Sequence, residues 1–143
     1  MNTPRPATEH TAAHHARTCA GLHFDDRSDF ERASRGLLAR YDDFVIMGPL
    51  GRPMWDRPSF DFVQGECPPT VHPSLWRQAQ LNAIQGLFRV TEGMYQVRGF
   101  SLANMTVVEG TSGIVVIDPL TTVDSARKAM ALYFAHRPRR KVT

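Results

Sequence analysis

A chain of 143 residues with 42% hydrophobic side chains is long enough for one ordinary domain with its own core. It holds no apolar run of 18 residues, which argues against a membrane-spanning helix, and its N-terminus lacks the charged, apolar and small segments of a secretory signal. We therefore expect a cytoplasmic protein, and export of a longer parent protein stays open. The two cysteines lie 48 positions apart, a spacing that predicts free thiols rather than a disulfide framework or a zinc knuckle.

A basic run near the C-terminal end raises the question of nucleic-acid binding. The formal net charge is only +3, and the run consists of Arg137, Arg139, Arg140 and Lys141. Nucleic-acid binders spread such residues over a face and interleave aromatic side chains. This run instead follows the end of a predicted helix, where cations meet the negative end of the helix dipole. We expect no nucleic-acid partner.

Residues 1–20 are predicted to be a disordered tail. They are rich in Thr, Ala, Pro and His without periodicity, so they bury too little apolar surface to offset the entropy of ordering. His10, His14 and His15 lie in this tail. A metal site needs such side chains on a rigid element with further ligands, so these histidines are not assigned as ligands.

Residues 21–86 are predicted to form a helical and irregular segment that wraps around the rest of the chain. Ser28 and Glu31 have the spacing of a capping box, which predicts a short helix to about Arg40. Eight glycines and prolines between positions 48 and 69 argue against a long helix there. The expected aromatic anchors of this stretch are Trp55, Phe60 and Phe62.

A second helix in the same segment is predicted to start at Pro73, because proline suits the first helical turn. Gly86 is the expected end of this helix. Its expected buried face consists of Leu75, Trp76 and Ala79.

Residues 87–143 are predicted to begin the main domain, because the apolar period changes from 3.6 to 2 after Gly86. Residues 88–91 and 95–98 alternate around a turn at Glu92-Gly93, which predicts a β-hairpin. A second strand pair follows, at 105–109 and 114–117. The strand Ile114–Ile117 is apolar without interruption, which predicts cover on both of its faces.

The last predicted elements are a helix and the start of a strand. Asp118-Pro119 stops the preceding strand, and Thr121 or Thr122 caps the helix. Residues 141–143 have the pattern of a strand beginning. The helix has an apolar stripe made of Val123, Ala126, Met130, Tyr133 and Phe134.

Three stretches of the chain resemble the alkylsulfatase branch of the metallo-β-lactamase superfamily. They are HFDDRSDFERASRGLLAR (23–40), HPSLWRQAQLNAIQGLFRVTEGMYQVRGFSLANMTVVEG (72–110) and GIVVIDPLTTVDSARKAMALYFAHRPRRKV (113–142). The phrases WRQAQLN, YQVRGF, NMT and VVIDPL in this order are the most specific. The resemblance runs from about residue 22 to residue 143.

The resemblance implies an α+β fold, namely the N-terminal half of a metallo-β-lactamase-type αββα sandwich preceded by the helical and irregular wrapping segment. It also implies that the complete enzyme is a homodimer that hydrolyses alkyl sulfate esters with two zinc ions. In the family, a metal-binding stretch HxHxDH follows the helix that ends here near His136, and further ligands come far downstream. We therefore assign no catalytic residue and no metal ligand in this chain, and expect no cofactor in the isolated chain.

Three residues are candidates for a supporting role. For Asp118, the resemblance implies an acidic side chain at the strand end that orients the metal loop; the alternative is an Asp that only caps the turn before Pro119. Asn104 is a candidate for the rim of the site, although a role in the turn before Met105 is favoured. Arg98 could attract a sulfate anion, but its alternation with Val97 favours a solvent-facing strand position.

A second function from another class stays open. A stand-alone, non-catalytic interaction module could keep this part of the fold and use the exposed sheet to bind a partner.

Overall fold

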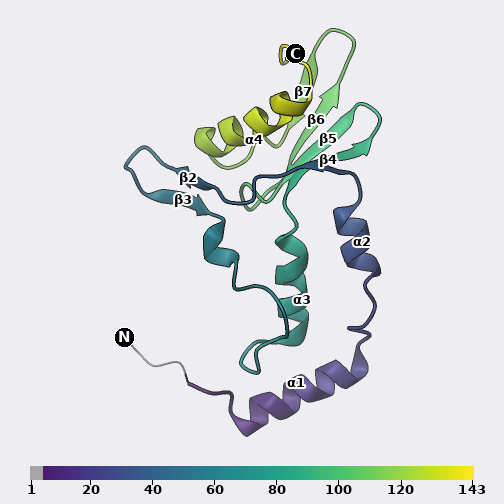
Figure 1. Ribbon diagram of the computed structural model, residues 1–143, viewed down its shortest axis with the longest axis vertical. Helices are drawn as coiled ribbons and strands as arrows, with labels where there is room; N and C mark the ends of the chain where they lie inside the picture. The colour runs from purple at the N-terminus through teal and green to yellow at the C-terminus, as the bar shows by residue number, and fades with distance from the viewer. Residues whose placement is uncertain (1–4) are drawn as a thin grey trace.

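A five-stranded antiparallel sheet forms the centre of the computed structural model, which describes residues 5–143 (Figure 1). The strand order is β1-β4-β5-β6-β7, so four strands follow one another as a meander. A separate two-stranded ribbon, β2-β3, projects away from the sheet. The sheet strands are β1 (Leu37–Ala39), β4 (Gly86–Thr91), β5 (Met94–Arg98), β6 (Met105–Glu109) and β7 (Ile114–Ile117).

Both predicted hairpins are present. β4 and β5 pair with Leu87 opposite Val97, and the chain turns at Gly93, whose φ of 69° lies in the left-handed region that glycine tolerates. β6 and β7 pair with Val107 opposite Val116. Because strand side chains alternate between the two faces, this register directs one apolar set toward the core and the other set away from it.

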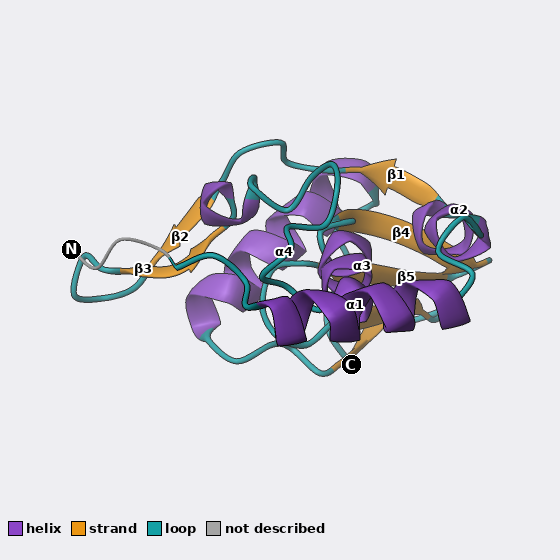
Figure 2. Ribbon diagram, turned by 90° about the horizontal axis from the view of Figure 1, so that it is seen from below, coloured by secondary structure: helices purple, strands orange, loops and turns teal. Residues whose placement is uncertain are grey.

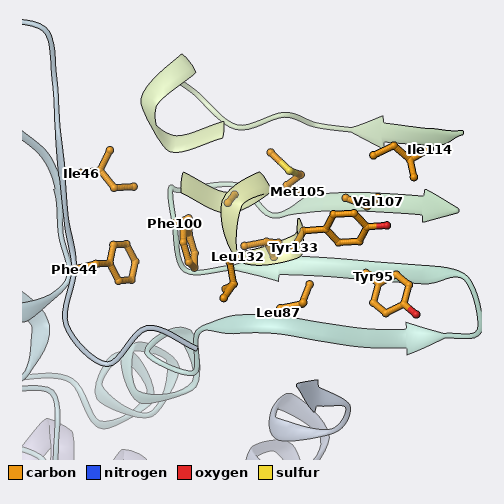
Figure 3. Packing of buried hydrophobic residues seen from close by; sticks show 12 residues of the cluster. Phe44, Ile46, Leu87, Tyr95, Phe100, Met105, Val107, Ile114, Leu132 and Tyr133 are labelled. Atoms are coloured by element: carbon orange, nitrogen blue, oxygen red, sulfur yellow. The ribbon is translucent and has the colours of Figure 1, made fainter. Parts of the chain in front are cut away.

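The helix α4 (Val123–His136) covers one face of the sheet. It begins at Thr122, whose hydroxyl accepts a hydrogen bond from the backbone N–H of Ser125 at 3.1 Å, so Thr122 is the cap. Figure 3 shows the core between α4, the sheet and the β2 segment. Its fully or almost fully buried members are Phe44, Ile46, Leu87, Tyr95, Val97, Phe100, Met105, Val107, Ile114, Ala129, Leu132 and Tyr133.

The apolar stripe predicted for this helix is partly wrong. Tyr133 is fully buried, but Val123 at the first turn is 71% exposed. Ala129 and Leu132 are the other buried apolar residues of the helix. The helix is rotated so that its buried line follows these residues, while Ala126, Met130 and Phe134 only flank the core.

The opposite face of the sheet is open at the β6-β7 end. Ile114 is fully buried, but Val115 and Ile117 are 45% and 55% exposed. The expected cover on both faces of β7 is therefore not provided by the described residues, because α4 packs on one face only. Beside β7, the backbone N–H of Thr143 donates to Ile114 O at 2.9 Å in a parallel bridge, as the strand-like pattern of 141–143 predicted.

The tail prediction is wrong for most of residues 1–20. Residues 1–4 lie outside the described residues, but α1 (Glu9–Gly21) is helical. The hydroxyl of Thr8 caps its first turn by accepting from Thr11 N at 3.2 Å. The prediction was based on the lack of a periodic apolar face, and none of the residues of α1 is buried. The helix depends instead on the cap and on helix-favouring alanines.

The helix predicted from Ser28 is shorter than expected. α2 (Ser28–Ser34) ends before Gly36, whose φ of 76° redirects the chain into β1. The predicted capping box is also wrong, since the carboxylate of Asp26 accepts the hydrogen bond from Ser28 N at 2.8 Å. Residues 37–39 join the sheet instead of the helix, with Leu37 opposite Phe88. This strand pairing outweighs the local helical pattern.

The wrapping segment holds the short ribbon of β2 (Val45–Met47) and β3 (Pro53–Asp56), followed by a 3-10 turn at Pro58–Phe60. Trp55 anchors this segment as predicted, because its indole N–H donates to Gly99 O at 2.8 Å and its ring stacks on Phe60. Phe62 was wrongly assigned as an anchor and is 70% exposed.

Helix α3 (Pro73–Asn82) starts at the predicted proline. It ends at Asn82, four residues before Gly86, which instead begins β4. Trp76 is buried, whereas Leu75 is 62% exposed and does not belong to the buried face. α1 lies across the far end of α3, which Figures 1 and 2 show from two sides.

Candidate functional site

The loop between β7 and α4 carries the first candidate residue, Asp118. Two residues of this loop have a left-handed backbone, Asp118 with a φ of 52° and Leu120 with a φ of 72°. Among the described residues they are the only non-glycines with a positive φ. Such backbone conformations cost free energy for residues with a Cβ and are typical of functional turns. The surrounding structure therefore holds this loop in one specific shape.

The side chain of Asp118 is exposed at the end of β7. Its Oδ1 accepts a hydrogen bond from Leu120 N at 3.3 Å, which is the turn contact that the simpler interpretation predicts. Its other carboxylate oxygen has no hydrogen-bond partner among the described residues. The turn contact therefore leaves one oxygen available to orient a neighbouring group.

Asn104 lies in the loop between β5 and β6, at the same end of the sheet as Asp118. It is exposed and lines a cavity of about 250 Å³ together with Arg98 and Leu102. The buried Ser101 hydroxyl, in the same loop, forms a hydrogen bond of 2.8 Å with the hydroxyl of Thr121. This bond ties the loop of Asn104 to the loop of Asp118, a link that the sequence did not reveal because 20 positions separate its partners.

Arg98 is not the solvent-facing residue that alternation favoured. Its guanidinium lies 4.2 Å from the centre of the Phe88 ring and donates to Gln96 Oε1 at 2.6 Å and to Ala33 O at 3.2 Å. Partial burial lowers the pKa of Arg98. These contacts cover Phe88 on the face away from α4, so Arg98 has a structural role, and its Nε and Nη1 atoms both donate within the described structure.

Among residues 5–143, no group of three or more His, Cys, Asp or Glu side chains is placed to hold a metal ion. The structure does gather His14, His15 and His72, whose ring centres lie 5.4 to 6.1 Å apart. The Nδ1 atom of His15 already forms a hydrogen bond with Pro69 O, and that of His72 accepts from Ser74 N. The cluster therefore acts as a contact between α1 and the start of α3.

The sequence did not reveal an ion pair between Arg137 and Glu109. Arg137 donates two hydrogen bonds to Glu109, from Nε at 2.8 Å and from Nη2 at 2.7 Å, and Tyr133 donates a third at 2.8 Å. A two-point guanidinium–carboxylate pair is among the stronger hydrogen-bonded arrangements. It joins the end of β6 to the end of α4, at the opposite end of the sheet from Asp118.

This environment perturbs the titration of all three groups. The hydrogen bonds from Arg137 hold the pKa of Glu109 below its ordinary value. Burial, followed by the neighbouring Glu109 carboxylate, raises the pKa of Tyr133. The carboxylate also raises the pKa of Arg137, so the first cation of the basic run is committed to a structural pair.

Of the helices in residues 5–143, none combines the length and the apolar character that crossing a membrane requires.

The comparisons with known proteins agree with the resemblance. No protein-family model matches the chain. It is 48% identical over 122 residues to the alkyl/aryl-sulfatase BDS1 of Saccharomyces cerevisiae. It is 48% identical over 139 residues to an (R)-specific secondary-alkylsulfatase, and 44% identical over 142 residues to a linear primary-alkylsulfatase, both from Pseudomonas. These matches cover 85%, 96% and 98% of this chain.

A solved structure gives the same result in three dimensions. The inverting sec-alkylsulfatase Pisa1 from Pseudomonas superposes with a TM-score of 0.88 at 48% identity over 96% of this chain. The chain spans about a fifth of the length of these relatives, between 19% and 22%. It belongs to the alkylsulfatase family. Its α+β fold is confirmed as part of the metallo-β-lactamase-type sandwich that the resemblance implied.

Proposed function

We propose that the full-length protein is a zinc-dependent alkylsulfatase that hydrolyses alkyl sulfate esters to alcohol and sulfate, and that this chain is its N-terminal part. The observation that supports this most directly is the TM-score of 0.88 with a sec-alkylsulfatase at 48% identity. Relatives named for primary and for secondary esters match at similar identity, 44% and 48%. The proposal therefore names the alkyl sulfate class and no particular ester.

In this proposal two zinc ions bind to parts of the full-length protein outside residues 1–143. The described residues do not fit the metals, because no three potential ligands converge among them. Catalytic zinc needs about three protein ligands and an open position. We therefore derive no step of the reaction through the metals from this chain.

The proposed contribution of this chain is structural support at one end of the sheet. The bond between Ser101 and Thr121 restrains the strand-end loop, and the left-handed turn at Asp118 leaves one carboxylate oxygen free. Hydrogen bonds from outside the ligand set orient metal ligands and raise their basicity. Asp118 would do this for the metal loop, Asn104 would lie at the rim of the site, and the full-length protein would act as a homodimer.

The test compares the isolated 143-residue chain with the full-length protein. We expect the full-length protein to retain zinc through dialysis and to release sulfate from dodecyl sulfate. The isolated chain should do neither, because its described residues hold no cluster of ligands. The measurements are metal content by elemental analysis and sulfate release against a metal-free blank.

Two results would contradict this proposal. Stoichiometric zinc or sulfate release by the isolated chain would place the metal site within these residues. A full-length protein without sulfatase activity would favour the non-catalytic interaction module, for which the exposed Val115 and Ile117 offer an apolar surface.

A further inference from the structure

Two cysteines that lie 48 positions apart in the sequence line the same cavity. Cys19 and Cys67 meet there, where the C-terminal end of α1 lies against α3 and the loop before α3. The volume of this cavity is about 580 Å³. Cys19 is exposed, Cys67 is half-buried, and both are free thiols. The fold therefore brings together two thiols whose spacing in the sequence predicted no pairing.

A neighbouring contact shows which side of α1 faces this loop. The Nδ1 atom of His15 forms a hydrogen bond of 3.1 Å with Pro69 O. Cys19 comes four residues after His15, so it lies one turn further along the same side of the helix. Cys67 comes two residues before Pro69, which is at most about 7 Å of chain. The two cysteines therefore lie on segments that are already in contact.

The surroundings of Cys67 also indicate that its thiol lies close to Cys19. Burial raises the pKa of Cys67, and the neighbouring Cys19 raises it further. The interaction between two charges falls with distance and is screened beyond about 10 Å in water, so this second cause requires a short separation. The Cys67 thiol directs its hydrogen toward Val71 O at 3.4 Å and Pro68 O at 3.5 Å, which holds the sulfur beside the cavity.

Helix α1 has the freedom to bring the two sulfurs into bonding distance. None of its residues is buried, so a small shift of the helix exposes no core side chain. A disulfide requires Cα atoms about 4.4–6.8 Å apart. Cys19 is also the more accessible thiol of the two, and accessible thiols are the ones that an oxidant in solution reaches first.

We propose that Cys19 and Cys67 form an intrachain disulfide when the protein meets a peroxide, and that this bond fastens α1 to the loop before α3. The Cys19 sulfur first attacks hydrogen peroxide, the O–O bond breaks, and a sulfenic acid and one water form. The Cys67 sulfur then attacks the Cys19 sulfur, so that the S–S bond forms and the S–O bond breaks. The released oxygen leaves as a second water with the Cys67 proton. The peroxide takes up the two electrons that the two thiols lose.

This inference stands on the two thiols and does not rest on the sulfatase activity. The experiment treats the full-length protein with hydrogen peroxide, blocks the remaining thiols with iodoacetamide and digests the protein without reductant. We expect mass spectrometry to find a peptide pair that joins Cys19 to Cys67 and that disappears on reduction. An equal mixture of ¹⁵N-labelled and unlabelled protein should give only pairs of one isotope, because the bond lies within one chain.

A displaced thiol tests whether the position of Cys19 matters. Cys19→Ser should abolish the cross-link. Adding Arg17→Cys to that variant restores a thiol on the same helix, about 200° around its axis from both Cys19 and His15. Arg17 is exposed, and this double variant should give roughly tenfold less cross-link to Cys67, because its thiol points away from the loop.

Hydrogen exchange tests the fastening of α1. Peptides from residues 9–21 should exchange several-fold more slowly in the oxidised protein, because the disulfide suppresses local opening of a helix that has no buried residue. Peroxide should leave the exchange of these peptides unchanged in Cys19→Ser.

Four results would overturn the proposal. They are the absence of a peptide pair joining Cys19 to Cys67, pairs of mixed isotope, an equal yield from the displaced thiol, and unchanged exchange of α1 after oxidation. The first two need no variant, so they decide the matter even where a substitution impairs folding. Sulfate release is measured separately, so a failure of this inference is distinct from a failure of the proposed function.

Discussion

Asp118 illustrates how one residue can satisfy two interpretations that the sequence left open. Its Oδ1 caps the turn by accepting from Leu120 N, as a simple turn residue would. Its φ of 52° lies in the left-handed region, which Asp tolerates better than most residues with a Cβ. The next left-handed residue, Leu120 with a φ of 72°, is the unusual one, and an exposed carboxylate held in this turn is consistent with the supporting role that we propose for Asp118.

Replacing Asp118 by Asn tests that role at the level of one side chain. In the full-length protein, Asp118→Asn should lower zinc affinity or turnover by roughly 10- to 100-fold, the scale of a lost partner of a metal ligand. The fold should survive, because the amide oxygen can still cap the turn. Asp43→Asn, at an exposed position distant in sequence, is the control. Unchanged zinc content and turnover in Asp118→Asn would show that Asp118 is only a turn residue.

Glu109 predicts a pH dependence whose sign follows from its environment. Its pKa in the folded protein lies below the ordinary value of 4.5, chiefly because Arg137 donates hydrogen bonds to it. The unfolded state therefore binds a proton more readily than the folded state. The pair stabilises the fold fully above about pH 4.5, and this contribution is lost as the pH falls through the lowered pKa.

The Glu109→Gln variant tests this linkage. It should lower the free energy of unfolding by roughly 1–3 kcal/mol at pH 7, because the carboxylate accepts bonds from Arg137 and from the buried Tyr133. Thermal unfolding of the full-length protein between pH 3 and 7 is the measurement. The midpoint of Glu109→Gln should fall less steeply below pH 5 than that of Glu92→Gln, a control in an exposed turn. Parallel curves for the two variants would contradict the assignment.

At the scale of secondary-structure elements, helix α4 depends on the cap at Thr122. The Thr122 hydroxyl accepts from Ser125 N, and the neighbouring Thr121 hydroxyl serves Ser101 instead. The local pattern permitted either threonine as a cap. The bond from Thr121 to a distant loop decides between them.

Thr122→Ala should destabilise α4 by about 1 kcal/mol, the usual cost of a lost side-chain cap. Hydrogen exchange measured on peptides from residues 123–136 of the full-length protein should show faster exchange, most clearly in the first turn. The control is Thr111→Ala, the same substitution in the exposed β6-β7 turn, where the threonine caps no helix. Equal protection of α4 in both variants would refute the role of the cap.

At the scale of the whole molecule, the open face of the sheet is the dominant feature. Val115 and Ile117 are about half exposed on the side away from α4, and among residues 5–143 only 141–143 pair with the β7 edge. Apolar strands of this kind belong between two layers. Exposed apolar edges are also templates for pairing with another chain.

The isolated 143-residue chain should therefore be poorly folded or should associate. Burial of one Val, Ile or Phe side chain stabilises a fold by about 1.5–3 kcal/mol, and the free energy of unfolding of an ordinary domain is only about 5–15 kcal/mol. Leaving several such side chains exposed therefore removes a large part of the stability. Size-exclusion chromatography and urea unfolding are the measurements. A monomer with one sharp cooperative transition would contradict this expectation and would favour the stand-alone module.

The sequence alone determined the elements that depend on neighbouring residues. The β4-β5 hairpin follows from period-2 alternation, the start of α3 at Pro73 from a proline at the first helical turn, and the end of β7 at Ile117 from the Asp-Pro stop that comes next. The family was also recognisable, because the resemblance depends on the order of the residues.

Only the tertiary structure decided which elements meet. It paired residues 37–39 with β4 where the local pattern predicted helix, and it brought Ser101 to Thr121 and Glu109 to Arg137. These contacts join positions 20 to 51 residues apart, and their free energy comes from burial and pairing that no local window contains. Helix α1, which was predicted to be a disordered tail, has a different origin: none of its residues is buried, and it depends on the cap at Thr8 and on its alanines, with one distant hydrogen bond from His15 to Pro69.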